Sequence, residues 1–121
     1  MTTERLNQIS MQMLTLSGNA KKLLTEVLDD LANPDTPSGD HQAKLNQTHQ
    51  YLVDAHKQQN LVTAEINHVT YSVLFAHAQD TLMNTETIEF IIKKFIPILQ
   101  NQNKTLMRLL LKIEYHFYCL L

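Results

Sequence analysis

The stretch from Thr70 to Gln100 reads TYSVLFAHAQDTLMNTETIEFIIKKFIPILQ, and it decides the fold. Its apolar residues recur at three- and four-residue steps, a spacing that predicts an α-helix. They also fall on more than one face, so we expect this helix to be buried on most sides. Pro97 lacks a backbone N–H and should kink or end the helix near Lys93. The apolar positions are Leu74, Ala78, Leu82, Ile88, Ile92, Phe95 and Leu99, together with Val73, Phe75, Met83, Phe90 and Ile91.

Two more helices are predicted before this stretch. Residues 4–32 carry one apolar stripe at helical spacing, interrupted by Gly18, where we expect another helix to approach closely. Residues 42–66 carry an alternating three-four spacing typical of a helix bundle, with Thr48 as a polar member. Between them the segment NPDTPSGD, residues 33–40, has the Pro, Gly and small polar residues of a loop.

The connection between the second and third helices is barely marked. Asn67-His68 is the best place for it, although no Gly or Pro forces a turn, and a helix running continuously across this point is the alternative. Only 2 Gly and 3 Pro occur in 121 residues, which disfavours a many-turned β fold. We therefore expect an all-α domain over residues 1–100, with its third helix over residues 70–100. Because three helices cannot easily cover the third one, we also expect self-association.

The last segment, residues 101–121, differs in character. It has basic residues on one side and apolar residues on the other, which predicts an amphipathic helical tail. Packing on the bundle or between subunits is one interpretation, and contact with a membrane surface is the other. The basic residues are Lys104, Arg108 and Lys112, and the apolar residues are Leu106, Leu109, Leu110, Ile113 and Phe117.

The composition of the chain argues against several classes of protein. Hydrophobic residues make up 44% and charged residues 18%, an ordinary globular balance, and the net charge of -2 gives no broad electrostatic surface for nucleic acid. Cys119 is the single cysteine, so an intrachain disulfide is excluded and a reducing compartment fits. The first residues, MTTERLNQIS, lack a signal-peptide pattern, and no apolar run approaches the roughly 20 residues of a membrane span. We therefore expect a cytoplasmic protein.

The segment HAQDTLM, from His77 to Met83, is the most informative one for chemistry. An imidazole, an amide and a carboxylate are costly on an apolar helix surface unless they are paired or used. His77 and Asp80 are three residues apart and therefore share one helix face. From this pattern alone, a hydrogen-bonded structural histidine is the simpler interpretation.

The motifs in this chain resemble the lactose/cellobiose-specific IIA component of the bacterial phosphoenolpyruvate-dependent sugar phosphotransferase system. YSVLFAHAQDTLM, residues 71–83, is similar to the family signature, in which the first His of HxQDxLM accepts the phosphoryl group. AHKQQ, residues 55–59, is similar to the AHxxQ of the family's second helix. LSGNAKKLL, residues 16–24, is similar to a small-residue and basic stretch of its first helix. The resemblance runs from about residue 11 to residue 100.

The resemblance implies an antiparallel three-helix bundle that assembles into a trimer. It implies that His77 takes a phosphoryl group from phospho-HPr and passes it to a cysteine of a IIB partner. That partner serves a membrane IIC permease for a β-linked disaccharide of the lactose, cellobiose or chitobiose class. The resemblance also implies that Asp80 and its symmetry mates hold a divalent cation, usually magnesium, on the trimer axis. An ion pair between Asp80 and a Lys or Arg of a neighbouring chain is the alternative.

The residue chemistry agrees with a phosphoryl carrier. One nitrogen of a neutral imidazole can attack phosphorus while the other nitrogen keeps its proton. The transfer needs positioning and charge neutralisation more than covalent help from the protein. Gln79, Gln59 and His56 are candidates to contact the phosphate, and an ordinary hydrogen-bonded side chain is the equal alternative for His56. A magnesium ion suits carboxylate oxygens and would relieve repulsion among Asp80 carboxylates gathered on an axis.

The remaining histidines and methionines have simpler interpretations. His49 lies seven residues before His56 on one helix face, but no third ligand is evident, so zinc is not expected. Three histidines are expected to be solvated: His41, His68 and His116. Four methionines are expected in the core: Met11, Met13, Met83 and Met107.

Departures from the family pattern keep a second function class open. Thr81 stands where family members commonly have His, and Asn60 stands where they have Thr. The linker near Asn67 is shortened, and residues 101–121 have no clear counterpart. These differences leave the nucleophile in place but bear on transfer rate and partner fit. The alternative function is that of a divergent non-catalytic or regulatory paralogue, a trimeric helical interaction protein.

Overall fold

The structure is a computed structural model that describes residues 1–33, 35 and 40–120. It contains three α-helices: α1 (Thr3–Ala32), α2 (Asp40–Thr63) and α3 (Val73–Leu120). A short 3₁₀ helix, η1 (Ile66–His68), lies between α2 and α3, and no strand occurs in the described ranges. The prediction of an all-α chain with three helices is therefore confirmed. Association of the chains into a trimer stays a prediction.

The chain divides into two compact units, residues 1–90 and residues 91–121. Unit 1 holds α1, α2, η1 and the beginning of α3. Unit 2, in its described residues, is the helical remainder of α3. The predicted domain boundary after residue 100 stays a prediction.

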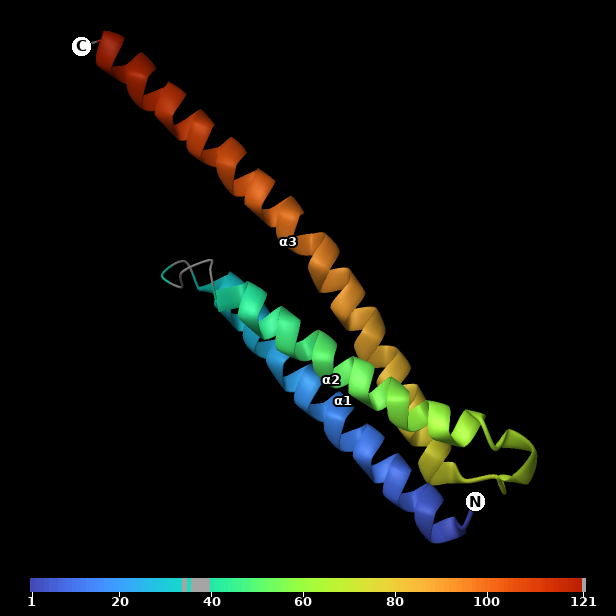
Figure 1. Cartoon of the computed structure of the whole chain (residues 1–121). Coiled ribbons are helices and arrows are strands. Elements are labelled where there is room, and N and C mark those ends of the chain that lie inside the picture. Colours follow the sequence, from blue (N-terminus) through green and yellow to red (C-terminus); the bar gives the residue numbers. More distant parts are fainter. Residues whose placement is uncertain (34, 36–39, 121) are drawn as a thin grey trace. The chain divides into compact units, whose positions relative to one another are not determined.

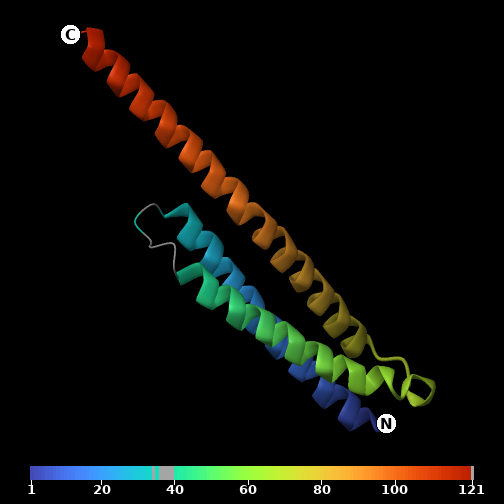
Figure 2. The ribbon, with the colours of Figure 1, turned by 45° about the horizontal axis from the view of Figure 1, so that its top comes forward.

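Helices α1 and α2 lie side by side and run in opposite directions (Figures 1 and 2). Thr2 is the N-cap of α1, because its Oγ1 accepts a hydrogen bond of 3.1 Å from the backbone N–H of Arg5. After the last turn, the backbone N–H of Asn33 donates to the carbonyl of Asp30 at 3.2 Å. Most of the predicted loop over residues 33–40 lies outside the described residues, and α2 begins at its last residue, Asp40.

The connection from α2 to α3 corrects two predictions. α2 ends at Thr63 rather than at residue 66, and α3 begins at Val73 rather than at residue 70. The alternative of one continuous helix is wrong, because residues 64–72 form a turn, η1 and an extended segment. The physical reason lies at Ser72, whose Oγ accepts from the backbone N–H of Phe75 at 3.1 Å and so gives α3 a defined start.

The core of unit 1 confirms the predicted apolar stripes. Leu82 is fully buried, and burying a leucine side chain stabilises a fold by roughly 1.5–3 kcal/mol. Polar side chains also enter this interior, since Ser17 and Thr48 are fully buried. The central cluster draws on all three helices and comprises Leu6, Ile9, Met13, Ala20, Leu52, Ala55, Val62, Ala78 and Leu82.

The sequence predicts a kink or an end of the helix near Lys93. The end is wrong, because Pro97 lies inside α3, and the kink stays a prediction. The helix continues to Leu120, and the segment predicted as a separate tail, residues 101–121, is part of it as far as it is described. A proline removes one backbone hydrogen bond, here the one that would reach the carbonyl of Lys93. Because α3 has 48 residues, the remaining backbone hydrogen bonds hold the helix through this position.

Much of the apolar surface of α3 is not covered within one chain. Val73, Met83 and Phe90 are exposed, although the sequence predicts burial on most sides of this helix. Three methionines predicted in the core are also exposed: Met11, Met83 and Met107. Of the four, only Met13 is buried. This exposed apolar surface supports the prediction of self-association.

Gly18 corrects another prediction. Apart from the adjacent residues and the backbone of α1 itself, no atom of the described residues lies within 4 Å of the position that a Cβ on Gly18 would occupy, so no other described helix approaches closely there. His41 is the remaining correction in unit 1, because it is buried rather than solvated and its Nδ1 lies 4.0 Å from Asp30 Oδ2. His68 and His116 are exposed as predicted.

Candidate functional site

The first two turns of α3 position the predicted phosphoryl acceptor. Ser72 caps the helix, and the backbone N–H of Ala76 donates to the Ser72 carbonyl at 3.0 Å, which closes the first turn. His77 follows directly in the second turn. Because helix side chains lean toward the N-terminus, the imidazole of His77 lies over the first turn. The partial positive charge of a helix N-terminus favours an anion in that region.

The ring of His77 is accessible. The residue is exposed, and within the described part of the chain its imidazole makes no hydrogen bond or ion pair. Its backbone carbonyl accepts a hydrogen bond of 2.9 Å from Thr81 Oγ1. The hydroxyl of Thr81 is therefore directed along the helix toward its own preceding turn. Both ring nitrogens of His77 remain available for a group that arrives from outside the chain.

Asp80 shares the outer side of α3 with His77, as the sequence spacing predicts. It is exposed and forms no ion pair in the described residues. No group of three or more His, Cys, Asp or Glu side chains that could hold a metal ion occurs in residues 1–33, 35 and 40–120. Asp80 is therefore not part of a group of three or more such side chains, and a magnesium ion held by it would take its other oxygen ligands from water or from further chains.

The side chain of His56 is paired with a residue other than His77. Its Nε2 lies against Glu86 Oε1, which ties α2 to α3. A second pair follows one step along the same two helices, because His49 Nδ1 lies 3.4 Å from Glu89 Oε1. Glu86 is nine residues after His77, which on an α-helix is a rotation of about 180° from it. Within one chain, His56 and His77 are therefore associated with opposite sides of α3.

Two predicted glutamines lie near the beginning of α3 or the end of α2. Gln79 is half-buried and lines a small cavity of about 190 Å³, whose other walls include Val62 and Phe75. Gln59 is half-buried in α2, and its backbone carbonyl accepts from Thr63 Oγ1 at 3.2 Å. His77 does not line the cavity. No hydrogen bond or ion pair joins either glutamine side chain to His77 in the described residues.

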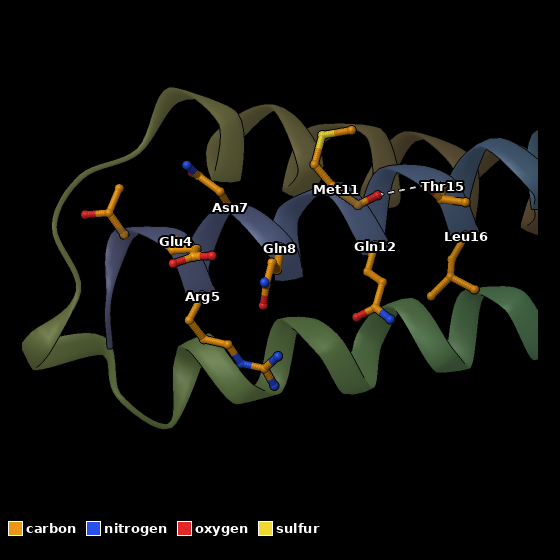
Figure 3. Close-up of a pocket in the computed structure, with 9 residues that line it drawn as sticks. Glu4, Arg5, Asn7, Gln8, Met11, Gln12, Thr15 and Leu16 are labelled. Atoms are coloured by element: carbon orange, nitrogen blue, oxygen red, sulfur yellow. Dashed lines mark hydrogen bonds between the residues drawn. The ribbon is translucent and has the colours of Figure 1, made fainter.

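A hollow larger than the cavity beside Gln79 lies elsewhere (Figure 3). It is an open groove whose lining residues all belong to the first half of α1, from Thr3 to Leu16. None of the predicted site residues lines it. Its one internal hydrogen bond drawn in Figure 3 joins Thr15 Oγ1 to the Met11 carbonyl at 3.0 Å, a contact within the helix. Within one chain, the groove is therefore separate from His77.

Sequence reasoning missed three residues that shape this region. Ser72 is the cap of α3, and Glu86 and Glu89 are the partners of His56 and His49. The sequence does contain a signal for these pairs. His49 and His56 are seven residues apart in one predicted helix, and two glutamates are three residues apart in the next. In antiparallel helices the first histidine pairs with the second glutamate, and this order is the one observed.

The comparison with known proteins identifies the family of the chain. Residues 8–100 match the family described as "PTS system, Lactose/Cellobiose specific IIA subunit". The chain has no match among curated proteins. The matched segment covers most of the chain and includes most of α1, all of α2 and the part of α3 that carries His77. The chain therefore belongs to the lactose/cellobiose-specific IIA subunit family of the phosphotransferase system.

Proposed function

We propose that this protein is a phosphocarrier that holds a phosphoryl group on His77. Family membership supports a component of the phosphotransferase system with a transferase role. The observation that carries the specific proposal is the exposed imidazole of His77, which has no partner for its ring within the described residues. His56 and His49 differ from it, because each has one ring nitrogen paired with a glutamate of α3.

The proposed reaction has two transfers. In the first, a neutral His77 nitrogen attacks the phosphorus of a donor phosphohistidine, a P–N bond forms on His77, and the donor P–N bond breaks with its electron pair returning to the donor ring. In the second, a cysteine thiolate attacks the same phosphorus and the bonding electrons return to His77. The second ring nitrogen keeps its proton throughout. The chain supplies positioning and charge stabilisation rather than further covalent chemistry.

The first turn of α3 supports the phosphorylated state. A phosphoryl group on His77 carries nearly two negative charges at neutral pH. The helix N-terminus contributes partial positive charge over that turn, with Ser72 fixing where the helix starts. The hydroxyl of Thr81 donates its hydrogen bond to the His77 carbonyl, so it is not directed at the phosphoryl oxygens.

The single chain offers His77 few neighbours, and we propose that other copies complete the site in a homotrimer. The exposed apolar residues Met83 and Phe90 lie on the same helix and supply surface for such an assembly. Gln79, Gln59 and His56 of one chain or another are the proposed phosphate contacts. Asp80 from each copy is the proposed ligand of a magnesium ion. That ion would offset the mutual repulsion of the carboxylates.

The proposed partners follow from the family. HPr is the donor, a IIB cysteine is the acceptor, and a IIC permease takes up a β-linked disaccharide of the lactose, cellobiose or chitobiose class. We propose that the reaction takes place in the cytoplasm. No helix in the described part of the chain is both long enough and apolar enough to cross a membrane.

A phosphorelay assay tests the proposal. The purified chain is mixed with phosphoenolpyruvate, enzyme I and HPr, and intact mass is read at neutral pH. We expect one phosphoryl group on the wild-type chain and none on His77→Gln. His116→Gln is the matched control, because His116 is an exposed histidine of the same helix and should keep full acceptance. Equal phosphorylation of His77→Gln and the wild type would contradict the proposal.

If a folded and trimeric wild-type chain accepts no phosphoryl group, the second function takes the place of the first. The protein would then be a non-catalytic or regulatory paralogue that keeps the helical assembly. The exposed apolar surface of α3 beyond residue 100 is the observation that favours such an interaction protein.

A further inference from the structure

The segment in front of His77 is held to the rest of unit 1 by few side chains. Residues 64–68, which follow α2, are all exposed. Val73, the first residue of α3, is exposed by 71%. Of this segment, Val69 and Phe75 pack against the central core cluster. Local hydrogen bonds are therefore important in keeping the first turn of α3 formed.

Ser72 supplies two hydrogen bonds that close this first turn. Its Oγ accepts from the backbone N–H of Phe75 at 3.1 Å, and its carbonyl accepts from the backbone N–H of Ala76 at 3.0 Å. The side chain of an N-cap residue satisfies a backbone N–H that has no partner within the helix. Replacing such a residue by alanine shifts the local equilibrium from helix toward coil by roughly fivefold. Ser72 therefore favours the helical form of residues 73–76.

The first turn of α3 is also the surface over which the side chain of His77 lies. On an α-helix, each side chain leans toward the N-terminus and covers the turn that precedes its own Cα. For His77 that turn contains Val73 and Leu74, which are four and three residues earlier. If these residues leave the helix, the imidazole loses this support, and the backbone N–H of His77 loses its acceptor, the carbonyl of Val73.

The orientation of the imidazole matters for the transfer itself. A nucleophile reacts fast only when it is held close to its line of attack, and small displacements of the reacting atoms lower the rate strongly. The imidazole of His77 makes no hydrogen bond or ion pair within the described residues, so no side chain of the described chain fixes its ring directly. The backbone beneath the ring is therefore the part of this chain that can orient it.

We propose that Ser72 is a positioning residue for phosphoryl transfer at His77. It acts through the first turn of α3 rather than by contact with the phosphoryl group. This role rests on the phosphocarrier function proposed above, and it adds a residue that lies five positions before the acceptor. Ser72 is half-buried and lines the same cavity of about 190 Å³ as Gln79, so a threonine in its place has room for one more methyl group.

Thr2 provides a matched control at the beginning of another helix. Its Oγ1 accepts from the backbone N–H of Arg5 at 3.1 Å, which is the distance and the three-residue spacing of the Ser72 cap. Thr2→Ala and Ser72→Ala therefore remove equivalent caps, but only Ser72 caps the helix that carries His77. A general loss of stability would affect phosphoryl acceptance alike in both variants, whereas a positioning role separates them.

Phosphoryl acceptance and amide exchange in the full chain test the proposal. With phospho-HPr as the donor, the rate constant at saturating donor should fall about fivefold in Ser72→Ala, while the KM for phospho-HPr stays unchanged. Thr2→Ala should keep the wild-type rate constant, and Ser72→Thr should restore it. Hydrogen exchange at the backbone N–H of Ala76, which donates to Ser72, should become faster by a similar factor in Ser72→Ala alone.

Four results would overturn the role of Ser72 and leave the phosphocarrier function standing, because the wild-type chain still accepts phosphate in each. They are a wild-type rate constant in Ser72→Ala, an equal loss in Thr2→Ala, no recovery in Ser72→Thr, and unchanged exchange at Ala76. A wild-type chain that accepts no phosphoryl group from phospho-HPr would instead overturn the phosphocarrier function, and the role of Ser72 with it.

Discussion

His56 of α2 is paired with Glu86 of α3, on the side of α3 that lies about 180° from His77. The AHKQQ segment therefore contributes to the joint between two helices of one chain. Both side chains of the pair are partly exposed, at 44% and 33%. Such pairs stabilise folds weakly, by about 0.2–1 kcal/mol. If His56 also contacts a phosphoryl group, that group is on the His77 of another copy.

The first prediction concerns this pair. Glu86→Gln should lower the free energy of unfolding by less than about 1 kcal/mol and leave phosphoryl acceptance by His77 unchanged. Urea denaturation gives the stability, and His56→Gln with the double variant completes a cycle that isolates the pair. Lys57 and Asp54, at 3.3 Å within α2, offer a control pair that does not join two helices. A folded Glu86→Gln chain that no longer accepts phosphate would show that the pair organises the site.

The second prediction concerns Asp80 and magnesium. In the wild type, chelation of divalent cations should shift the chain from trimers toward smaller species, because carboxylates on an axis then repel each other. Asp80→Asn should assemble equally well with and without magnesium. Sedimentation velocity at several magnesium concentrations measures both, and Asp35→Asn is the control because Asp35 is also exposed. A wild-type mass that ignores magnesium would contradict the proposed ion.

How much the sequence could predict differs between the fold and the site. The stripes through Met13, Leu52 and Leu82 were predictable, because burial of one helix face imposes a repeat of three and four residues. The continuation of α3 through Pro97 was not predictable, because the backbone hydrogen bond that proline removes is only one of those that hold this long helix. The start of α3 was missed because a single hydroxyl, that of Ser72, sets it.

The site was predicted in part for a related physical reason. The shared helix face of His77 and Asp80 follows from their spacing along α3, which is local information. The partner of His56 depends on how α2 and α3 are packed, which no local pattern specifies. Contacts between copies of the chain also depend on how the copies assemble, which no local pattern specifies either.

The third prediction compares two buried threonines. Thr48 is fully buried and its hydroxyl has no hydrogen-bond partner in the described residues, whereas the hydroxyl of buried Thr85 donates to the Thr81 carbonyl at 2.7 Å. Thr48→Val should therefore raise the free energy of unfolding by about 1 kcal/mol, since it removes an unpaired buried hydroxyl. Thr85→Val should not. Urea denaturation of both variants provides the test, and a destabilised Thr48→Val chain would indicate a bound water or another partner.

The fourth prediction concerns Gly18. Apart from the adjacent residues and the backbone of α1 itself, a Cβ there meets no atom of the described residues within 4 Å, and glycine inside a helix is less favourable than alanine by about 0.5–1 kcal/mol. Gly18→Ala should therefore stabilise the chain by about that amount in thermal or urea unfolding. Asn19→Ala is a control at the next exposed position of α1. A loss of stability or of trimer mass in Gly18→Ala would show that another copy packs closely against α1 at this point.

The most direct measurement for the central claim is the location of the phosphoryl group. The chain is phosphorylated through HPr, fragmented at neutral pH, and analysed by tandem mass spectrometry over all 6 histidines. We predict one phosphoryl group on the peptide and fragment ions that contain His77, and its loss when a IIB thiol acceptor is added. A phosphoryl group on His56, on His116 or on any residue other than His77 would contradict the account.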